Sequence, residues 1–321
     1  MTAGKQTKFV GVRGAIRCQE SMAKHTSWKV GGPARYFFEP QDLDDLTAFL
    51  QSLASQVPIL WLGLGTNVLV RDGGFDGAVI AVHRGLRAMK YLGEGRLMAE
   101  AGVSCARFSR FAVRHGRAGA EFLAGVPGTM GGALAMNAGA FGGETWNLVE
   151  EVDLVDREGA LHRHSAQSFA VSYRKVEIPK AHWFTAGYFR LGEVSEKDEA
   201  ITVRSLLEKR AASQPVRLSS AGSVFRNPLD DYAARLIEVS GLKGARCGGA
   251  AVSMQHANFI VNDRQASAND IETLIKKVRE TVADQTGVVL EPEVRFVGDD
   301  CLLYTSPSPR DRTRSRMPSS A

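Results

Sequence analysis

The most informative residues of this chain are glycines, and their number and spacing indicate a ligand-binding site. From Phe122 to Gly143 the chain reads FLAGVPGTMGGALAMNAGAFGG, twenty-two residues with seven glycines and no charge. Each glycine costs conformational entropy on folding, so a hydrophobic core does not need this many. An anionic or planar ligand lying against main-chain N–H groups would explain them. The alternative is a Gly/Ala loop packed under another element.

A second glycine-rich turn, Gly63–Asn67 (GLGTN), follows an apolar run that predicts a buried strand. Gly-x-Gly after a strand suggests a nicotinamide dinucleotide site, but the sixth position of the GxGxxG fingerprint is Val68, and a strand pattern follows it instead of a helix. A Rossmann domain is therefore disfavoured, and no GKS or GKT P-loop occurs. Two separate glycine turns suit one extended diphosphate ligand, and a dinucleotide cofactor has the right size.

The elements that must position these turns alternate between helical and strand patterns, and no internal repeat occurs before residue 300. The last predicted helix begins at Ser267 with a capping box to Asp270 and ends at Gly287. The other predicted helices are Asp42–Gln56, Cys105–His115, Lys197–Ala212 and Leu229–Val239. The predicted strands are Val57–Leu62, two in VLVRDGGFDGAVIAV, Val149–Val155, Phe184–Leu191 and Val288–Val297.

Composition bounds the class of protein. With 321 residues, 44% hydrophobic and 23% charged, the chain predicts a globular protein of two or three domains. The uncharged glycine run has the length of a membrane span, but its proline, asparagine and seven glycines argue against one, and no signal peptide pattern occurs. The four cysteines are scattered without a CxxC pair, which argues against a zinc site and against a disulfide framework and fits a reducing cytoplasm.

The last 21 residues, Cys301–Ala321, have no apolar period and are rich in Ser, Pro and Arg. The string CLLYTSPSPRD resembles a translated transposon-end sequencing adapter, and we hypothesise that this tail is adapter read-through; a genomic locus that encodes it would overturn the hypothesis. The alternative is a disordered basic tail. Without the tail's net +3, the formal charge falls from +5 to +2. The chain therefore gives no indication of nucleic-acid binding.

Seven motifs in a fixed order carry a family resemblance that covers about His25 to Gly298. They resemble the UDP-N-acetylenolpyruvoylglucosamine reductases, flavoenzymes of peptidoglycan precursor synthesis. The motifs are His25–Pro33 (HTSWKVGGP), Leu62–Asn67 (LGLGTN), Glu121–Gly143, Tyr173-Arg174, Ala221–Pro228 (AGSVFRNP), Gly248–Asn262 (GGAAVSMQHANFIVN) and Leu290–Gly298 (LEPEVRFVG).

The resemblance implies an α+β fold with an FAD-binding part of the vanillyl-alcohol-oxidase (PCMH) type. The implied boundaries are 1–82 and 83–200 for two FAD-binding subdomains and 201–300 for an α+β substrate-binding domain, with 288–300 returning to the first subdomain. It also implies a cytoplasmic monomer with non-covalent FAD, NADPH as co-substrate, a UDP-sugar nucleotide as substrate, and no metal.

The implied reaction has two stages: NADPH reduces FAD, and flavin N5 then gives hydride to C3 of the enolpyruvyl group. Arg174 and Glu293 match the family's stabilising pair, and Ser223 matches its proton donor to C2. Arginine is a fixed cation with a forked donor geometry suited to a carboxylate that gains charge. A serine hydroxyl is a poor acid, so Arg226 or a water would have to assist it.

The resemblance also carries over binding residues. The implied cofactor-binding residues are Gly63, Gly65, Thr66, Asn67, Gly125, Pro127, Gly128, Gly131, Gly132, Asn137 and Gly139. The implied substrate-binding residues are Tyr173, Asn227, Lys243, His256 and Asn258.

Each assigned residue has an ordinary structural alternative. A serine in AGS is usually a turn residue, and a glutamate on an amphipathic strand is usually solvated. Tyr173-Arg174 could be a surface strand pair, and His256 could be a core histidine bonded to backbone. Only fifty positions separate Tyr173 from Ser223, which indicates the family's short form without the extra substrate loop, so the residue that covers the diphosphate cannot be carried over.

Two other functions stay open at this point. One is a different PCMH-type flavin enzyme, such as an oxidase of a small alcohol or acid, although no motif for its base or for a covalent flavin link occurs. The other is a non-catalytic nucleotide-binding module.

Overall fold

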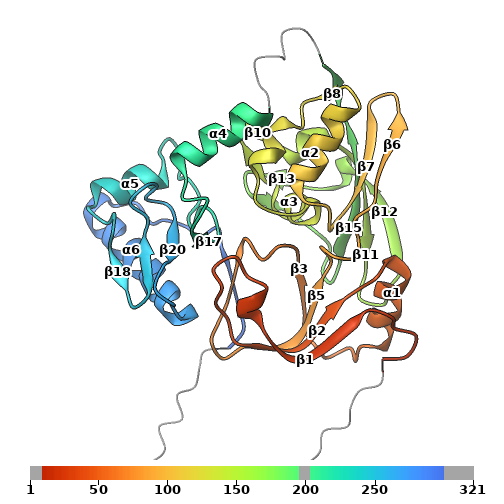
Figure 1. Ribbon diagram of the computed structural model, residues 1–321, viewed down its shortest axis with the longest axis horizontal. Helices are drawn as coiled ribbons and strands as arrows, with labels where there is room; N and C mark the ends of the chain where they lie inside the picture. Colours follow the sequence, from red (N-terminus) through yellow and green to blue (C-terminus); the bar gives the residue numbers. More distant parts are fainter. Residues whose placement is uncertain (1–8, 195–202, 300–321) are drawn as a thin grey trace, which may run out of the picture.

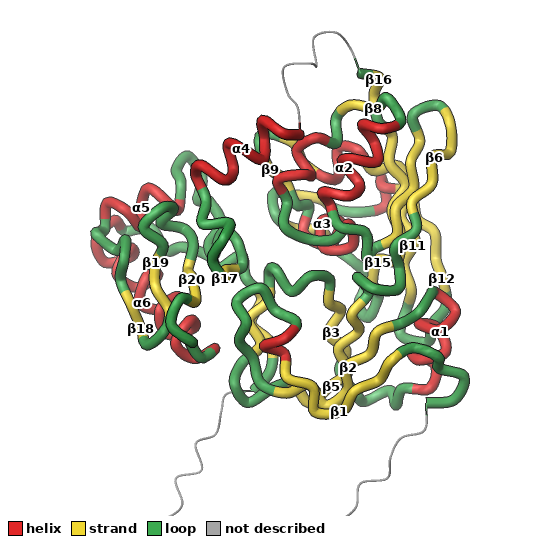
Figure 2. Tube along the Cα trace, viewed as in Figure 1, coloured by secondary structure: helices red, strands yellow, loops and turns green. Residues whose placement is uncertain are grey.

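The computed structural model describes residues 9–194 and 203–299, which form two lobes joined by a helix (Figures 1 and 2). The larger lobe contains two sheets and the smaller lobe contains the C-terminal region. The first part of the predicted helix Lys197–Ala212 and the tail Cys301–Ala321 lie outside the described residues.

The first sheet has the order β1-β2-β5-β3, with β1 antiparallel to β2 and the other pairs parallel. Helix α1 packs on this sheet through Leu46, Phe49 and Leu50, and the Asp42 carboxylate caps it by accepting the N–H of Asp45. The bounds are β1 (Ala15–Ser21), η1 (Met22–Lys24), β2 (Pro33–Glu39), α1 (Leu43–Ser52), β3 (Ile59–Leu62) and β5 (Phe75–Ala81).

The strand–turn–strand pattern after the GLGTN turn is confirmed, but its two strands join different sheets. The first, β4 (Val68–Val70), pairs in parallel with β21 (Arg295–Val297) from the C-terminal end of the described chain. The predicted strand Val288–Val297 is wrong over most of its length. Pro292 has no N–H for a ladder, and this segment makes only an isolated bridge to Phe225.

The second sheet is a five-stranded antiparallel sheet of order β12-β11-β15-β7-β6. Helices α2 and α3 pack on it, and Phe108, Leu134 and Phe189 share its core. Its bounds are β6 (Met89–Gly93), β7 (Arg96–Glu100), α2 (Cys105–Arg114), α3 (Met130–Met136), β11 (Val149–Val155), β12 (Leu161–Ser165) and β15 (Trp183–Arg190). The short strands of this region form separate two-stranded pairs, β9 with β10, β13 with β14 and β8 with β16. The bounds of the short elements are β8 (Arg117–Ala118), η2 (Glu121–Gly125), β9 (Gly139–Ala140), β10 (Gly143–Glu144), η3 (Thr145–Leu148), η4 (Ala166–Ser168), β13 (Val171–Ser172), β14 (Lys175–Val176) and β16 (Gly192–Glu193).

The C-terminal lobe is a small sheet of order β17-β20-β19-β18 covered by α5 and α6. The predicted capping box of Ser267 and Asp270 is present, and Gly287 ends α6 in the left-handed conformation (φ 75°). The bounds are α4 (Val203–Ser213), β17 (Ser219–Ser220), α5 (Ala233–Val239), β18 (Arg246–Cys247), β19 (Ala250–Val252), β20 (Ile260–Asn262) and α6 (Ala268–Thr286).

The N-terminal segment is built into the C-terminal lobe. The Trp28 indole is fully buried in that lobe's core and donates to the Ile260 carbonyl at 2.7 Å. The Asp72 carboxylate accepts the first two amides of α6, at 3.0 and 2.9 Å, and the Arg71 guanidinium forms a two-point ion pair with Glu272. The first sheet and the C-terminal lobe are therefore tied together by side chains as well as by the β4–β21 pair.

No helix within the described residues is long and apolar enough to cross a membrane.

Candidate active site

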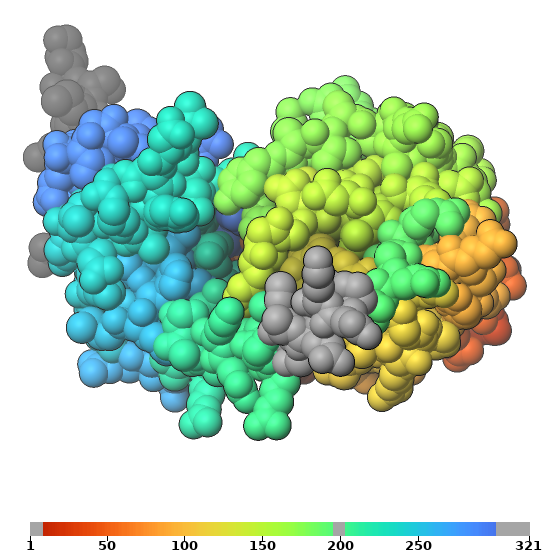
Figure 3. Space-filling view, turned by 90° about the horizontal axis from the view of Figure 1, so that it is seen from above, coloured from red at the N-terminus to blue at the C-terminus, as the bar shows by residue number. Residues whose placement is uncertain are grey.

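A cavity of about 570 Å³ lies where the three regions meet. Seen from above, the blue and cyan C-terminal lobe lies beside the yellow-green part of the larger lobe, with green atoms of the α4 region at their junction (Figure 3). The GLGTN turn after β3, the glycine-rich run around α3, and three side chains from later in the chain line the cavity. Those three are Arg174, Ser223 and Glu293, so the structure brings together the residues predicted to be catalytic.

The two glycine turns meet at this cavity, although they are about sixty residues apart in the sequence. Of the residues predicted to bind the cofactor, ten line it: Gly63, Gly65, Thr66, Asn67, Gly125, Pro127, Gly128, Gly131, Gly132 and Gly139.

Asn137 is the exception, and its predicted contact with the cofactor needs correction. It is the left-handed C-cap of α3 (φ 45°) and is 2% exposed. Its side-chain amide donates to the Glu144 carboxylate and the Ser172 carbonyl, and its oxygen accepts the N–H of Trp146. Because protein groups use its amide, Asn137 shapes the turn after α3 and does not line the cavity.

The glycines divide into two physical classes. An added Cβ would lie 2.6 Å from Thr129 Oγ1 at Gly63, 2.1 Å from the His25 carbonyl at Gly65, and 2.7 Å from Ala101 Cβ at Gly131. These positions, like Gly125 and Gly139, exclude a side chain because the protein itself fills the space. The simple loop-packing alternative is therefore correct for part of the run.

Gly128 and Gly132 belong to the second class. A Cβ at Gly128 would approach only Thr66 Oγ1, at 3.6 Å, and one at Gly132 only Thr129 Oγ1, at 3.7 Å. Both residues border the cavity, so what a side chain would fill there is ligand space. Trp61 also borders it, and its buried indole N–H has no hydrogen-bond partner among the described residues. A backbone cradle with a spare donor fits an FAD diphosphate and ring.

Arg174 is held from three sides. Its guanidinium donates to the Gly139 carbonyl at 2.9 Å and to the Asn137 carbonyl at 3.4 Å. Its Nε lies 3.3 Å from Glu293 Oε1, and the two side chains are only 17% and 13% exposed. The interpretation of Arg174 as a surface strand residue is therefore wrong, as is that of Glu293 as a solvated one.

Burial raises the pKa of Glu293 above its ordinary value, while the charges of Arg174 and Arg226 oppose that rise. Arg226 also donates to the Arg174 carbonyl at 3.3 Å. Arg174 has a left-handed backbone (φ 56°), which a non-glycine residue rarely adopts. The contact from Arg226 thus joins the turn that carries Arg174 to the segment that carries Ser223.

Ser223 is positioned through its neighbours. The Val224 N–H donates to the Asn258 carbonyl, and the Asn258 side chain both accepts from and donates to the backbone of Phe225, all at 2.8–2.9 Å. The Glu293 N–H donates to the Val224 carbonyl at 2.7 Å. Since Asn67 in turn donates to the Glu293 carbonyl at 3.2 Å, Ser223, Glu293 and the GLGTN turn form one hydrogen-bonded network.

None of the five residues predicted to bind substrate lines the cavity. Asn258, 3% exposed, forms hydrogen bonds with the backbone of Phe225, close to Ser223. The Asn227 side chain accepts the first N–H of α5. Lys243 forms an ion pair with Glu238 at 2.7 Å. The remaining two are Tyr173, whose ring lies 5.1 Å from the Arg174 guanidinium carbon, and His256, whose Nδ1 accepts the N–H of Asn258.

The structure also adds cavity residues that the sequence analysis missed. Arg210 and Gln214, hydrogen-bonded to each other, reach the cavity from the end of α4, and burial lowers the pKa of Arg210. Arg295 lines the cavity from β21, and the predicted alternation puts it on the same side as Glu293, so the sequence pattern could have identified it. Arg210 carries no such signal, because it lies on a helix with no clear apolar stripe.

The fold and the cavity define a flavoprotein built around an FAD-binding domain. An FAD binding domain family matches residues 34–165, and the family described as the C-terminal domain of UDP-N-acetylenolpyruvoylglucosamine reductase matches residues 214–297. The reductase of Methylococcus capsulatus is 53% identical over 89% of this chain and 94% of its own length, and that of Alkalilimnicola ehrlichii is 52% identical over 89% and 96%. This chain belongs to the UDP-N-acetylenolpyruvoylglucosamine reductase family.

A solved structure supports the assignment. The reductase from Thermus caldophilus superposes with a TM-score of 0.76 at 32% identity, over 89% of this chain and 99% of that one. The protein is thus an FAD-dependent oxidoreductase, a UDP-N-acetylmuramate dehydrogenase of peptidoglycan precursor synthesis that uses NADPH, and its length is that of the short form. The predicted family, α+β fold and cofactor are confirmed. The oxidase and the non-catalytic module are set aside.

Proposed function

We propose that three side chains of this cavity divide the work of the reductase reaction: Arg174 stabilises charge, Glu293 orients Arg174, and Ser223 delivers the proton. When bound, FAD supplies the hydride chemistry, taking it from NADPH and passing it to the enolpyruvyl group. The glycine turns would hold FAD through main-chain N–H groups, with Gly128 and Gly132 leaving the space that it needs. Charge stabilisation and proton delivery are assigned to side chains of the protein.

Arg174 is suited to stabilise the substrate carboxylate as negative charge develops on it. Its guanidinium is fixed by the Gly139 carbonyl and by Glu293, so little reorganisation is needed when charge appears. The low exposure of its side chain strengthens this interaction over the same contact in water. Burial raises the pKa of Glu293, and its carboxyl group pairs with the Arg174 guanidinium and fixes the direction of that side chain.

Ser223 would protonate C2 of the substrate. A free hydroxyl is a weak acid, so the transfer needs the positive field of the nearby arginines, which stabilises the alkoxide as the proton leaves. Arg174 lines the same cavity, and Arg226 follows Ser223 by three residues and bonds the Arg174 backbone. Both cations are thus fixed relative to the segment that carries Ser223.

Arg210 and Arg295 are the other arginines that border the cavity within the described chain. We assign them to phosphate recognition, because the FAD and the UDP-sugar each bring a diphosphate to this region. In the absence of the long form's loop, Arg210 at the end of α4 is placed to cover one of them. Neither Lys243 nor His256 lines the cavity, although the His256 ring contacts that of Phe259, a cavity residue. Both side chains would contact the sugar nucleotide only where it extends beyond the cavity.

The observation that carries the proposal is that Arg174, Ser223 and Glu293 converge on one cavity from three separate segments of the chain. We test it with Ser223→Ala, measuring the two half-reactions separately and anaerobically. Reduction of the flavin by NADPH should change less than about threefold, whereas its reoxidation by the enolpyruvyl sugar nucleotide should slow by at least about a thousandfold. Ser220→Ala, the same change three residues earlier and outside the cavity, is the control. Equal losses in both half-reactions would refute the role of Ser223.

We also propose that the enzyme acts as a cytoplasmic monomer. The three cysteines within the described residues are free, which fits a reducing compartment. All three proposed catalytic residues come from one chain. Light scattering coupled to gel filtration should give the mass of one chain, and a stable dimer would contradict this.

A further inference from the structure

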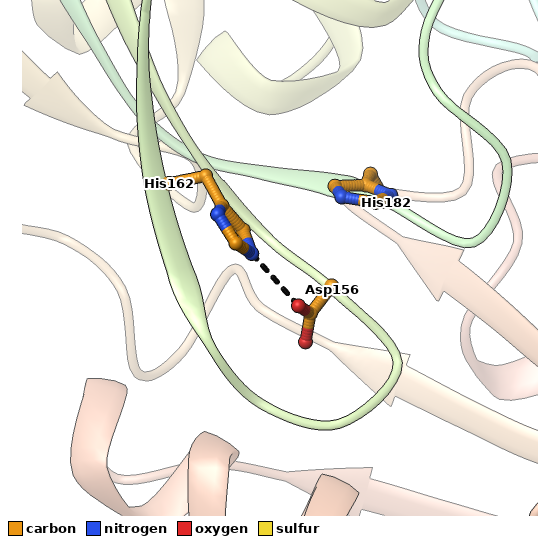
Figure 4. A group of neighbouring side chains, drawn as sticks. All are labelled: Asp156, His162 and His182. Atoms are coloured by element: carbon orange, nitrogen blue, oxygen red, sulfur yellow. Dashed lines mark hydrogen bonds and ion pairs between the residues drawn. The ribbon is translucent and has the colours of Figure 1, made fainter.

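Three side chains outside the proposed catalytic group form a compact cluster at the edge of the second sheet (Figure 4). Asp156 begins the turn between β11 and β12, His162 lies on β12, and His182 immediately precedes β15. One ligand atom of each lies within 4.8 Å of the other two. His162 Nε2 is already 2.7 Å from Asp156 Oδ2, the contact drawn as a dashed line. This is the one such group among the residues that the structure describes.

The carboxylate is oriented by its own turn. Asp156 Oδ1 accepts the N–H groups of Glu158 and Ala160, at 3.0 and 2.8 Å. These bonds leave Oδ2 directed at His162. The Asp156 side chain is therefore oriented by its own turn, with Oδ2 on the side of His162.

His182 is oriented in the same manner. Its Nδ1 lies 2.8 Å from the Lys180 carbonyl, which can only accept, so Nδ1 carries the proton and Nε2 is left as a lone-pair donor. A backbone carbonyl that fixes the tautomer and direction of a histidine is the usual outer partner of a metal-binding imidazole. Two of the three side chains thus have the supporting hydrogen bonds of metal ligands.

We propose that Asp156, His162 and His182 form a Zn²⁺ site with an open fourth position. Two imidazoles and one carboxylate are a donor set that zinc accepts. Ligand atoms about 2.0–2.1 Å from a tetrahedral zinc lie roughly 3.3 Å apart. The separations to His182, at most 4.8 Å, must therefore shorten by up to about 1.5 Å, and the 2.7 Å contact between His162 and Asp156 must widen slightly. The half-buried His162 and His182 can make that movement by side-chain rotation, with the zinc replacing the present His162–Asp156 hydrogen bond.

The location gives the site a consequence. His182 borders the cavity, and the next residue, Trp183, stacks on Trp61 with ring centroids 5.6 Å apart. Trp61 belongs to β3 of the first sheet and Trp183 to β15 of the second. Zinc would fix the segment before β15 and hold the two tryptophans together at the cavity edge. The proposed role of the site is therefore to stabilise the protein structure around the cofactor, and it takes no part in hydride or proton transfer.

The test uses the FAD-loaded enzyme without a histidine tag, stripped of metal with a chelator and titrated with Zn²⁺ against a chromophoric competitor. One equivalent should bind with a Kd of about 10 µM or tighter. His162→Gln and His182→Gln should each weaken binding at least about tenfold. His164→Gln is the matched control, because His164 lies two residues along the same strand with its ring 6.3 Å from that of His162 but outside the group. It should bind zinc as the wild type does.

Substituted Co²⁺ provides the second measurement, since its visible absorption distinguishes tetrahedral coordination from loose surface binding. Circular dichroism and flavin content will establish that each variant is folded. No binding by the wild type, or equal binding by wild type and the His162→Gln/His182→Gln double variant, overturns the proposal. Octahedral Co²⁺ spectra overturn the assigned geometry.

Discussion

At the scale of single residues, Arg174 is where the regions of the molecule meet. Its left-handed backbone costs about 1–2 kcal/mol for a non-glycine residue. The surrounding contacts hold it there: Asn137 and Gly139 accept from its side chain, and Arg226 donates to its carbonyl. Backbone strain that contacts from separate segments of the chain maintain is typical of a residue whose direction matters for function.

His256 gives a residue-scale prediction about pH. Burial, and then the charge of Lys243, lower the pKa of His256 below its ordinary value of 6.5. The folded chain therefore binds this proton less readily than the unfolded chain, so stability falls as the pH drops below about 6.5 and is unaffected well above it. His256→Gln should remove this part of the acid sensitivity, measured as the difference in urea unfolding free energy between about pH 7.5 and 5.5.

Lys243→Met is the second arm of that experiment. It removes one cause of the lowered pKa and leaves the burial, so its loss of stability on acidification should lie between those of the wild type and His256→Gln. If His256→Gln loses as much stability as the wild type over this range, the neutral buried histidine is not the source of the effect.

At the scale of elements, α3 offers a direct test of the cofactor cradle, because two adjacent glycines in it differ in what surrounds them. Gly132→Ala should leave stability within about 1 kcal/mol of the wild type, since the new Cβ makes only an ordinary contact and alanine favours the helix. It should weaken FAD binding at least about tenfold, because the methyl group enters the cavity. Flavin fluorescence on release measures that affinity.

Gly131→Ala is the matched control, and we expect it, unlike Gly132→Ala, to lower the stability of the protein. Its Cβ would lie 2.7 Å from Ala101 Cβ and 3.1 Å from the Ala101 carbonyl, so overpacking should cost about 1–3 kcal/mol of stability. The cradle interpretation is wrong if Gly132→Ala binds FAD as tightly as the wild type does.

The same elements show what the sequence could and could not predict. Local patterns predicted the exact bounds of β11, Val149–Val155, and the capping box of α6. They do not show which strands pair when the partner lies far along the chain: β4 pairs with β21 and not with β5. In the site, catalytic residues carried by a family pattern converge as expected. Asn137 and Asn258 do not reach the cavity, because a polar motif residue that bonds a ligand and one that bonds backbone look alike in sequence.

The proposed metal cluster was invisible to the sequence analysis for a related reason. Asp156, His162 and His182 have no metal-ligand spacing, and only the hairpin of β11 and β12, with the start of β15 beside it, brings them together. Arg210 was missed because nothing local distinguishes a helix end that faces a cavity from one that faces solvent.

At the scale of the whole molecule, the lobes do not follow the order of the chain. The core of the C-terminal lobe includes Trp28, Val30 and Leu69 from the first sheet's part of the chain. Asp72 and Arg71 add charged contacts to α6. The second sheet has its own core and meets this unit at the cavity, through Arg174 and α4 among others. The catalytic residues thus come together only when both units are in place.

This arrangement predicts which elements lose protection from hydrogen exchange when a core tryptophan of either unit is replaced. Trp28 and Trp146 are buried tryptophans whose indoles each donate one hydrogen bond, to the Ile260 carbonyl at 2.7 Å and the Leu134 carbonyl at 2.8 Å. Replacing either by alanine should cost about 3–5 kcal/mol. In native-state hydrogen exchange, Trp28→Ala should lower protection mainly in α6 and β20, more than two hundred residues away in sequence, while β11 and β15 change less. Trp146→Ala should give the reverse pattern, because its indole packs in the core of the second sheet. If Trp28→Ala lowers protection only in β1 and β2, the N-terminal segment merely covers the C-terminal lobe and is not part of its cooperative unit.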